Sequence, residues 1–357
     1  MKKNIFSVIV FGMFSIFNIY FFGILEWLSF ITFVALYFFI FYSLHIFYRL
    51  LTKGKIQSIK LIIPKFTFRF LLLLLIPFVL TGFFIFYENE ISPAEMPVYT
   101  ISNGKKIVVF QTMSHIGSEN FYKKVEENIS KYKKENYVYF YEGVKLVNDS
   151  KCVDPVTRKL RDTKECVETK KQVEKDLLKF NQILGFNFSN DFYEKISELI
   201  GLKFQDQETL LDVVNDKDIN IDLSLNKILS LYESKYGTGV YSQDKQIVNF
   251  DEQVFDEAKK LNSRGLWLVR YLYKGLLNFM IKDEDLGKNL GEQSTGDILS
   301  VILEDRDKNL AGNILNSEFD KIYVTYGLLH FKGTFDYLKS QDINWMITDV
   351  KFIKSIE

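Results

Sequence analysis

Two of the three histidines in this chain, His115 and His330, end similar stretches of sequence. His115 ends the run KIVVFQTMSH and His330 ends KIYVTYGLLH, and a glycine follows each histidine at Gly117 and Gly333. Runs of β-branched and aromatic residues that stop at a turn are typical of buried parallel strands. Ligands and catalytic groups collect at the carboxyl edge of such sheets. A single histidine at a strand end is more often structural, but the matched pair predicts one shared site.

A carboxylate close to the two histidines would complete a metal site. Glu142 directly follows another expected strand, residues 137–141, and would reach the same sheet edge. Two imidazoles and a carboxylate can bind a divalent metal ion such as Mn, Co or Zn and leave a position open for water. The metal would lower the pKa of that water and polarise a carbonyl. We therefore predict His115, His330 and Glu142 as metal ligands, with Glu142 also catalytic.

Arg306 is the expected catalytic cation. It lies in a predicted late helix and could stabilise an oxyanion or hold a substrate carboxylate. If no metal is bound, a histidine and Glu142 could together act as a general base on water. Two simpler interpretations stay open. Glu142 could pair with Lys145, and Arg306 could form surface ion pairs with the acidic residues beside it in the sequence.

The order of the expected elements predicts an α/β fold with a parallel-rich sheet wrapped by helices. The expected strands are residues 106–111, 137–141, 321–330 and 345–352. The expected helices, from apolar spacing and caps such as Ser118 and Gly201, are residues 119–133, 191–200, 251–261, 296–315 and 334–340. Residues 91–97, which contain two prolines, are expected to be a linker. The two histidine strands are the only internal similarity in the sequence.

One apolar run in the carboxyl-terminal half needs separate treatment. Residues 266–281 resemble a membrane helix at first sight, but Arg270, Lys274 and Asn278 recur every four residues along it. These side chains would form one polar stripe, and the run is short for a span. We therefore predict a core helix with one solvent-facing side.

The amino-terminal third is expected to lie in a membrane. Its three apolar runs each approach the ~20 residues that a spanning helix needs; they are residues 5–23, 25–48 and 70–87. The segment between the second and third runs, residues 49–69, holds six basic residues and no acidic one. The positive-inside rule then places the amino terminus in the cytoplasm and the carboxyl-terminal part outside it. We predict a three-helix membrane domain over residues 1–90 and an extracytoplasmic α/β domain over residues 91–357.

Charge and cysteine content bound the function of the outer part. The chain has a formal net charge of zero, but residues 88–357 hold more acidic than basic residues, which argues against nucleic acid as a partner. Its two cysteines, Cys152 and Cys166, both lie in the predicted outer domain, where disulfides persist. A disulfide is the expected pairing; a zinc pair is the alternative, although no second cysteine pair or nearby histidine supports it.

Several short motifs, in order, resemble the Tiki/TraB/GumN-type family. This Gly-x-x-His metalloprotease superfamily is related to ChaN and to erythromycin-esterase-like folds. The second Gly-x-x-His motif is intact as Gly327 to His330, whereas Thr112 replaces the glycine of the first motif. Glu142 after its strand matches the family carboxylate, and the late segment that contains Arg306 and Asn309 resembles the Glu-Arg-Asn helix segment of the family. Weaker matches in the middle of the chain contain Gln205 and Asp218.

The resemblance implies a sheet of parallel strands wrapped by helices and built by a divergent internal duplication. As an activity, it implies metal-dependent hydrolysis of peptides or proteins by a membrane-anchored enzyme. It also implies a substrate-binding role for Arg306, Tyr326 and Gly327, and secondary roles for Gln205, Asp218 and Asn309. The alternative is a non-catalytic membrane protein that binds or sequesters a peptide signal. The sequence contains no nucleophile elbow, phosphate-binding loop or dinucleotide fingerprint, so those enzyme classes are set aside.

Overall fold

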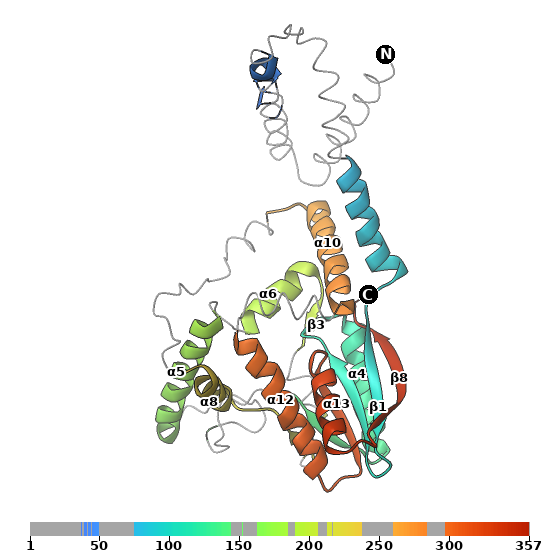
Figure 1. Cartoon of the computed structure of the whole chain (residues 1–357), viewed down its shortest axis with the longest axis vertical. Helices are drawn as coiled ribbons and strands as arrows, with labels where there is room; N and C mark the ends of the chain where they lie inside the picture. Colours follow the sequence, from blue (N-terminus) through green and yellow to red (C-terminus); the bar gives the residue numbers. More distant parts are fainter. Residues whose placement is uncertain are drawn as a thin grey trace. The chain divides into compact units, whose positions relative to one another are not determined.

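The structure is a computed structural model of the whole chain, shown in Figure 1. It describes residues 75–143, 152, 163–184, 190–205, 213–215, 217–237, 260–283 and 297–356, and several positions between 37 and 49. The chain divides into two compact units. Unit 1 comprises residues 1–92 and 253–276, and unit 2 comprises residues 93–252 and 277–357. Unit 1 breaks after Ser92, whereas the predicted boundary lies after residue 90, and unit 1 also contains residues 253–276, which were predicted in the outer domain.

Unit 2 contains a six-stranded sheet in the order β6-β4-β7-β2-β1-β8. Its strands are β1 (Glu95–Ser102), β2 (Ile107–Met113), β4 (Val138–Tyr141), β6 (Ile219–Asn220), β7 (Lys321–Gly327) and β8 (Met346–Lys354). The four strands from β6 to β2 are parallel to their neighbours, and β1 is antiparallel to both β2 and β8. The prediction of a parallel-rich α/β sheet is confirmed.

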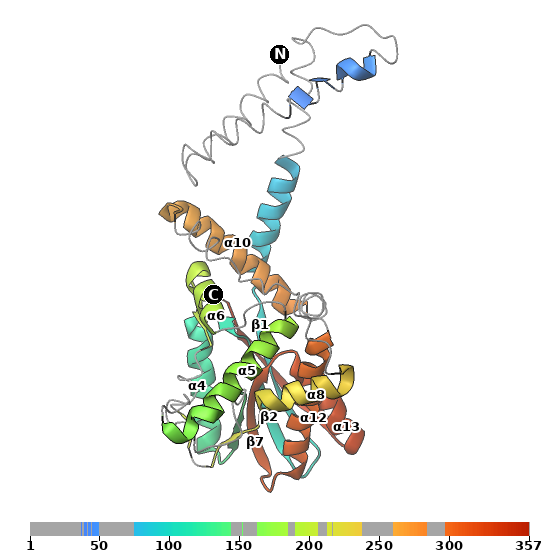
Figure 2. The ribbon, with the colours of Figure 1, turned by 90° about the vertical axis from the view of Figure 1, so that its left-hand side faces the viewer.

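Helices cover both faces of this sheet. On one face α4 (Glu119–Lys134) packs Val125 and Ile129 against β1 and β2, and on the other lie α12 (Asp297–Asn316) and α13 (His330–Gln341). Figure 2 shows α4 on one side of the strands and α12 and α13 on the other. Three further helices and a small sheet lie around this core; they are α5 (Val167–Leu184), α6 (Asn190–Ile200), α8 (Leu225–Tyr236), and the antiparallel pair β3 (Ile116–Gly117) and β5 (Lys203–Phe204).

The two histidine strands lie side by side. β2 and β7 pair in parallel from Ile107 opposite Lys321 to Met113 opposite Gly327. Apart from the first residue of each and Gly327, every residue of both strands is buried, because helices cover both faces of the sheet. Two strands far apart in sequence therefore end at the same edge. The internal duplication that would explain the pair stays a prediction.

The linker predicted at residues 91–97 is wrong over its second half, because β1 begins at Glu95. Pro97 argued against a strand, since proline cannot donate to a ladder. In the structure, pairing of β1 with β2 begins only at Val98, so the ring of Pro97 interrupts no bond on that side. The hydroxyl of Thr112 instead donates to the carbonyl of Pro97 at 2.6 Å. β1 and its pairing with β8 were not expected from the sequence.

In unit 1, the described residues include helical positions between 37 and 49, a helix over residues 75–86 and a short π-helix at Tyr87–Ile91. They also include α10 (Ser263–Lys282), which continues into unit 2. The first predicted span lies outside the described residues, as does most of the second and the start of the third. Within the described part, no helix combines the length and apolar character needed to cross a bilayer. The prediction of three spanning helices is thus not supported there, and the predicted orientation stays a prediction.

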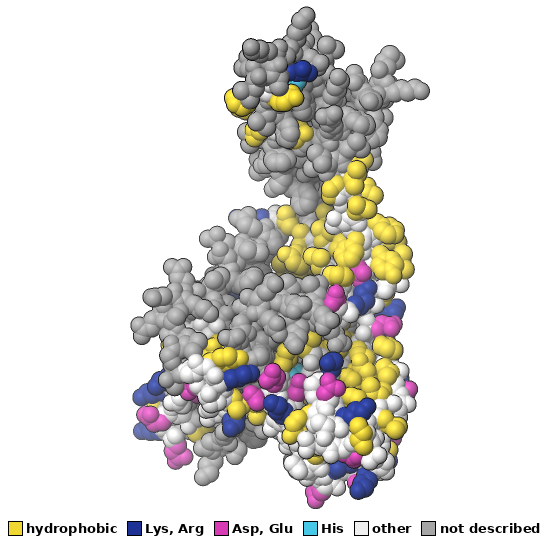
Figure 3. Space-filling view, viewed as in Figure 1, with side chains coloured by type: hydrophobic (Ala, Val, Ile, Leu, Met, Phe, Trp, Pro, Cys, Tyr) yellow, Lys and Arg dark blue, Asp and Glu magenta, His cyan; other side chains and the backbone are white. Residues whose placement is uncertain are grey.

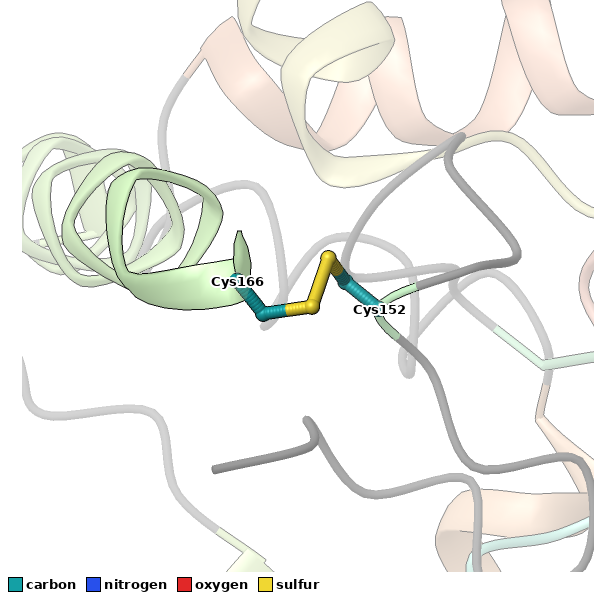
Figure 4. Close-up of a disulfide and its surroundings, with 2 residues drawn as sticks. All are labelled: Cys152 and Cys166. Atoms are coloured by element: carbon teal, nitrogen blue, oxygen red, sulfur yellow. A yellow bond between two sulfur atoms is a disulfide. The ribbon is translucent and has the colours of Figure 1, made fainter. Parts of the chain in front are cut away.

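Cys152 and Cys166 form a disulfide with a Cα–Cα distance of 5.4 Å, shown in Figure 4. Cys166 ends a single 3-10 turn that leads directly into α5. The bridge closes a loop of about 15 residues, a length that stabilises a fold by about 3 kcal/mol in the chain-entropy model. It therefore ties the start of α5 to the segment that follows β4.

Candidate active site

Four neighbouring parallel strands each deliver a polar residue to one edge of the sheet. Glu142 directly follows β4, and Asp222 lies two residues after β6. His115 lies two residues after β2, and His330 follows β7 after a short turn to begin α13. Because parallel strands end at a common edge, these side chains converge. The α12 helix, which packs on α13, supplies Arg306 to the same place.

The Arg306 guanidinium is the centre of the cluster. Its Nε donates to Asp222 Oδ1 at 2.8 Å, and its Nη2 donates to Asp222 Oδ2 at 2.7 Å and to Glu142 Oε1 at 2.6 Å. The second oxygen of Glu142 accepts the backbone N–H of Gly327 at 2.7 Å. The guanidinium and both carboxylates are almost completely withdrawn from solvent. Paired, bidentate contacts of this kind fix the position of a buried arginine.

Tyr326 completes the setting of Arg306. The Tyr326 hydroxyl donates to Asp222 Oδ1 at 2.9 Å and accepts from Arg306 Nε at 3.1 Å. Burial alone would lower the pKa of Arg306, but Tyr326, Glu142 and Asp222 raise it well above its usual range. Burial raises the pKa of Tyr326 well above its ordinary value, so its hydroxyl keeps its proton. The cluster therefore holds a permanent positive charge among carboxylates.

His330 is locked in one orientation. Its Nδ1 lies 2.6 Å from Asp307 Oδ1 and its Nε2 lies 3.4 Å from Arg306 Nη1. Burial, then Arg306 and His115, lower the pKa of His330 well below its ordinary value. The neutral ring therefore donates its Nδ1–H to Asp307 and presents the Nε2 lone pair to Arg306.

Gly333 makes this contact with Asp307 possible. The sequence suggested that Gly333 marks a turn and that a helix begins only at residue 334. Instead α13 begins at His330, and Gly333 lies inside its first turns. A Cβ atom at Gly333 would lie 1.8 Å from Asp307 Oδ2. The glycine is therefore required because the Asp307 carboxylate occupies the space that a side chain would fill.

His115 lies at the same edge of the sheet as His330, but its side chain is in a different environment. Its side chain is exposed, and its ring contacts Tyr193 with centroids 5.3 Å apart. Its backbone carbonyl accepts the N–H of Gln205 at 2.8 Å, which links the β2 end to β5. The pKa of His115 is lowered, first by surrounding protein and further by Arg306, with Glu142 opposing. The side chain is exposed to solvent although protein surrounds the ring, and the lowered pKa keeps the ring neutral at pH 7.

Two of the secondary candidates lie near this edge. Asn309 donates to the carbonyl of Ile221 at 2.5 Å and so holds the segment that carries Asp222. Gln205 is buried beside the His115 backbone, and its Oε1 has no hydrogen-bond partner in the described part of the chain.

Asp218 and Thr112 have structural contacts instead. Asp218 lies just before β6, where it pairs with Lys133 and accepts the backbone N–H of Tyr139. Thr112, the residue that replaces the expected glycine, is completely buried and bonded to Pro97, so it ties β2 to β1. The backbone at Thr112 is therefore enclosed within the sheet.

The predicted metal ligands are residue types that bind metal ions, but the ligating atoms of Glu142 and His330 are engaged in other contacts. Among the described residues, no group of three histidine, cysteine or acidic side chains is arranged to hold a metal ion. Arg306 contacts Glu142 Oε1 and His330 Nε2, two of the atoms that a metal would need. A metal ion at these atoms would require the guanidinium to move away, since two cations repel each other.

Two residues of the cluster, Asp222 and Asp307, were not predicted from the sequence. Asp222 follows a strand of only two residues, too short to show a period of two. Asp307 was treated only as a surface partner for Arg306, because both lie in a run of charged residues. The spacing of Arg306 and Asp307 on one helix turn, opposite a strand that ends in histidine, was the available signal. No family model, curated protein or solved structure matches this chain. The family resemblance therefore stays a prediction.

Proposed function

We propose that unit 2 is a hydrolase that attacks the carbonyl group of a peptide or ester at the carboxyl edge of its sheet. The observation that carries this proposal is the fixed, charged Arg306 held between Glu142 and His330, with the exposed and neutral His115 at the same edge. Hydrolysis needs a group that takes a proton from water and a cation where negative charge develops. The edge offers both.

His115 is the proposed general base. Its lowered pKa keeps the ring unprotonated at neutral pH, so a ring nitrogen can accept a proton from water. Solvent reaches His115, whereas His330 is buried and has both ring nitrogens engaged. In this proposal His330 is a positioning residue, because it holds Arg306 from the side opposite Asp222.

Arg306 is the proposed stabiliser of the oxyanion. A guanidinium has five N–H donors. The contacts to Asp222, Tyr326, Glu142 and His330 engage both Nη2 hydrogens, the Nε hydrogen and one Nη1 hydrogen. No other residue that the structure describes contacts the second Nη1 hydrogen, and in this proposal that hydrogen binds the incoming oxygen. Because the guanidinium is already held in place, it does not need to reorganise as charge develops on that oxygen.

A metal-dependent version of this hydrolase is the second candidate. Glu142 and Asp222 pair with the Arg306 guanidinium, and Asp307 pairs with His330. The cluster therefore holds three carboxylates and one guanidinium, and this excess of negative charge favours an added cation. A carboxylate behind His330 is also the usual support of a metal-binding imidazole. His115, His330 and Glu142 would hold the ion, which would supply an acidified water.

Hydrolysis by the purified full chain tests the proposal. The probes are a library of quenched fluorescent peptides and a nitrophenyl acetate ester. We expect turnover by the unchanged chain and no turnover by His115→Gln. The control is His45→Gln, at the remaining histidine of the chain, which should leave turnover unchanged. Turnover that survives His115→Gln would contradict the assignment. Peptide binding without turnover would favour the signal-sequestering alternative.

Metal analysis separates the two versions. Turnover that persists in EDTA, in protein without bound metal, supports the metal-independent hydrolase. Loss of turnover in EDTA, restored by Zn, Mn or Co, together with bound metal that disappears in His330→Gln, supports the second candidate. The proposed location outside the cytoplasm rests on the basic segment at residues 49–69 and is tested by reporter fusions at residues 60 and 100.

A further inference from the structure

The α10 helix has its polar stripe against the protein and its apolar stripe outside. The sequence predicted the reverse, with Arg270, Lys274 and Asn278 facing solvent. In the structure Asn278 is buried and accepts the backbone N–H of Ala94 at 2.8 Å. Arg270 and Lys274 are half-buried, and burial, followed by Arg270, lowers the pKa of Lys274. The prediction of a solvent-facing polar side is therefore wrong.

The exposed side of α10 is a continuous apolar stripe. Tyr273, Leu276 and Met280 are exposed, and the half-buried Val269 continues their row at the spacing of one helix face. Tyr273 is 48% exposed and Leu276 is 45% exposed. A soluble helix normally buries this kind of stripe and exposes its charges. On α10 the polar stripe is half-buried at Arg270 and Lys274 and buried at Asn278, whereas the apolar stripe is exposed. The apolar stripe therefore requires an apolar environment.

A second helix of unit 1 shares this property and lies against α10. Gly275 of α10 leaves no room for a Cβ atom, which would come within 2.9 Å of Ile85, and Asn89 donates to the carbonyl of Tyr271 at 2.8 Å. On the helix of residues 75–86, most apolar side chains are exposed by about half or more; they are Ile76, Phe78, Val79, Leu80, Phe83 and Phe86. Figure 3 shows hydrophobic side chains gathered over both helices.

We propose that the apolar stripe of α10 contacts the lipid of a bilayer, with the helix lying along the membrane interface. A helix that is apolar all round, such as residues 75–86, is stable only when buried or in lipid. Because α10 packs directly on that helix, its outer stripe continues the same apolar surface. Tyrosines such as Tyr87 and Tyr273 are side chains that favour the boundary between lipid and water. The charged stripe of α10 makes a helix that lies on the membrane more favourable than one that crosses it.

Fluorescent labelling tests this contact. Cys152 and Cys166 are bonded to each other, so a bimane label reacts only with an introduced cysteine. The variants are Leu276→Cys, in the apolar stripe, and Arg264→Cys, an exposed position on the same helix outside that stripe. The full chain is reconstituted in phosphatidylcholine and phosphatidylglycerol vesicles. Quenching is then measured with aqueous iodide and with lipid that carries a nitroxide near the headgroup.

The label at position 276 is expected to be quenched several-fold more by the nitroxide lipid than the label at position 264, and to be protected from iodide. The label at position 264 should show the opposite pattern. Iodide quenching at position 276 would overturn the proposal by placing the stripe in water. Protection from both quenchers would also overturn it, because protein would then cover the stripe. Both positions are exposed, so neither substitution removes a buried side chain.

Discussion

The two histidines that look alike in the sequence have opposite surroundings in the structure. His330 is buried, with Asp307 on one ring nitrogen and Arg306 on the other. His115 is exposed, and its ring contacts Tyr193 but accepts or donates no hydrogen bond within the described part of the chain. One histidine is held in place by the fold, and the other is accessible to solvent. Similar local sequence therefore does not assign similar roles, because the role depends on what the remaining elements bring to each ring.

Removal of Arg306 should cause the largest loss of stability, and it would remove one of the two contacts that hold the His330 ring. Arg306→Met leaves Glu142 and Asp222 without their cation in a buried place, which typically costs about 3–5 kcal/mol. Urea unfolding followed by hydrogen exchange of the β7 amides measures the loss in unit 2. Arg264→Met, at an exposed position, is the control and should change stability little. A loss below about 1 kcal/mol for Arg306→Met would show that the cluster does not need its arginine.

A methyl group at Gly333 should disturb His330 without touching its ring. Gly333→Ala places a Cβ atom on the Asp307 carboxylate, so the carboxylate must move and the His330 contact is lost. Overpacking of this kind costs about 1–3 kcal/mol. Gly312→Ala is the matched control, since no atom lies within 4 Å of its added Cβ and alanine favours a helix. Equal stability of the two variants would contradict the close approach of α12 and α13.

The pH dependence of stability should show that the buried His330 ring is neutral in the folded protein. The pKa of His330 is lowered in the folded protein, whereas in the unfolded chain it returns to about 6.5. Below that pH the unfolded chain binds a proton that the folded protein does not, so stability falls as pH falls. His330→Gln should flatten this fall between about pH 6.5 and 5 in denaturation curves. An unchanged slope would show that His330 is protonated in the folded protein.

The smallest effect on stability is expected at His115. His115→Gln replaces an exposed ring and should change the stability of unit 2 by no more than about 0.5 kcal/mol. The same variant should abolish hydrolysis if His115 is the base. Thermal unfolding and turnover measured on one preparation check both parts. A large loss of stability would remove the contrast between the two histidines.

The sequence predicted the sheet core and the residues of the site better than their contacts. β2, β4 and β7 follow from long apolar runs, and their parallel order brings Glu142 and His330 to one edge. β1 was missed because Pro97 argued against a strand there. β6 was missed because a strand of two residues is too short to show a periodic pattern. The Asp307 contact depends on Gly333 and on how two helices pack, which no local pattern encodes. The polar stripe of α10 was identified from the sequence, but whether it faces protein or solvent depends on how the neighbouring helix packs.

The register of β2 with β7 has a consequence for how the chain is made. β2 ends before residue 114, yet its parallel partner begins at Lys321, and β8, which pairs with β1, follows later still. During synthesis, β2 therefore emerges from the ribosome long before β7, its parallel partner, and its apolar side chains stay unpaired while most of the chain is made. Contacts this distant in sequence slow folding and leave strand edges open to misassembly. The cluster of Glu142, Arg306 and His330 can close only after α13 has emerged, so any premature stop before that helix yields a protein without its site.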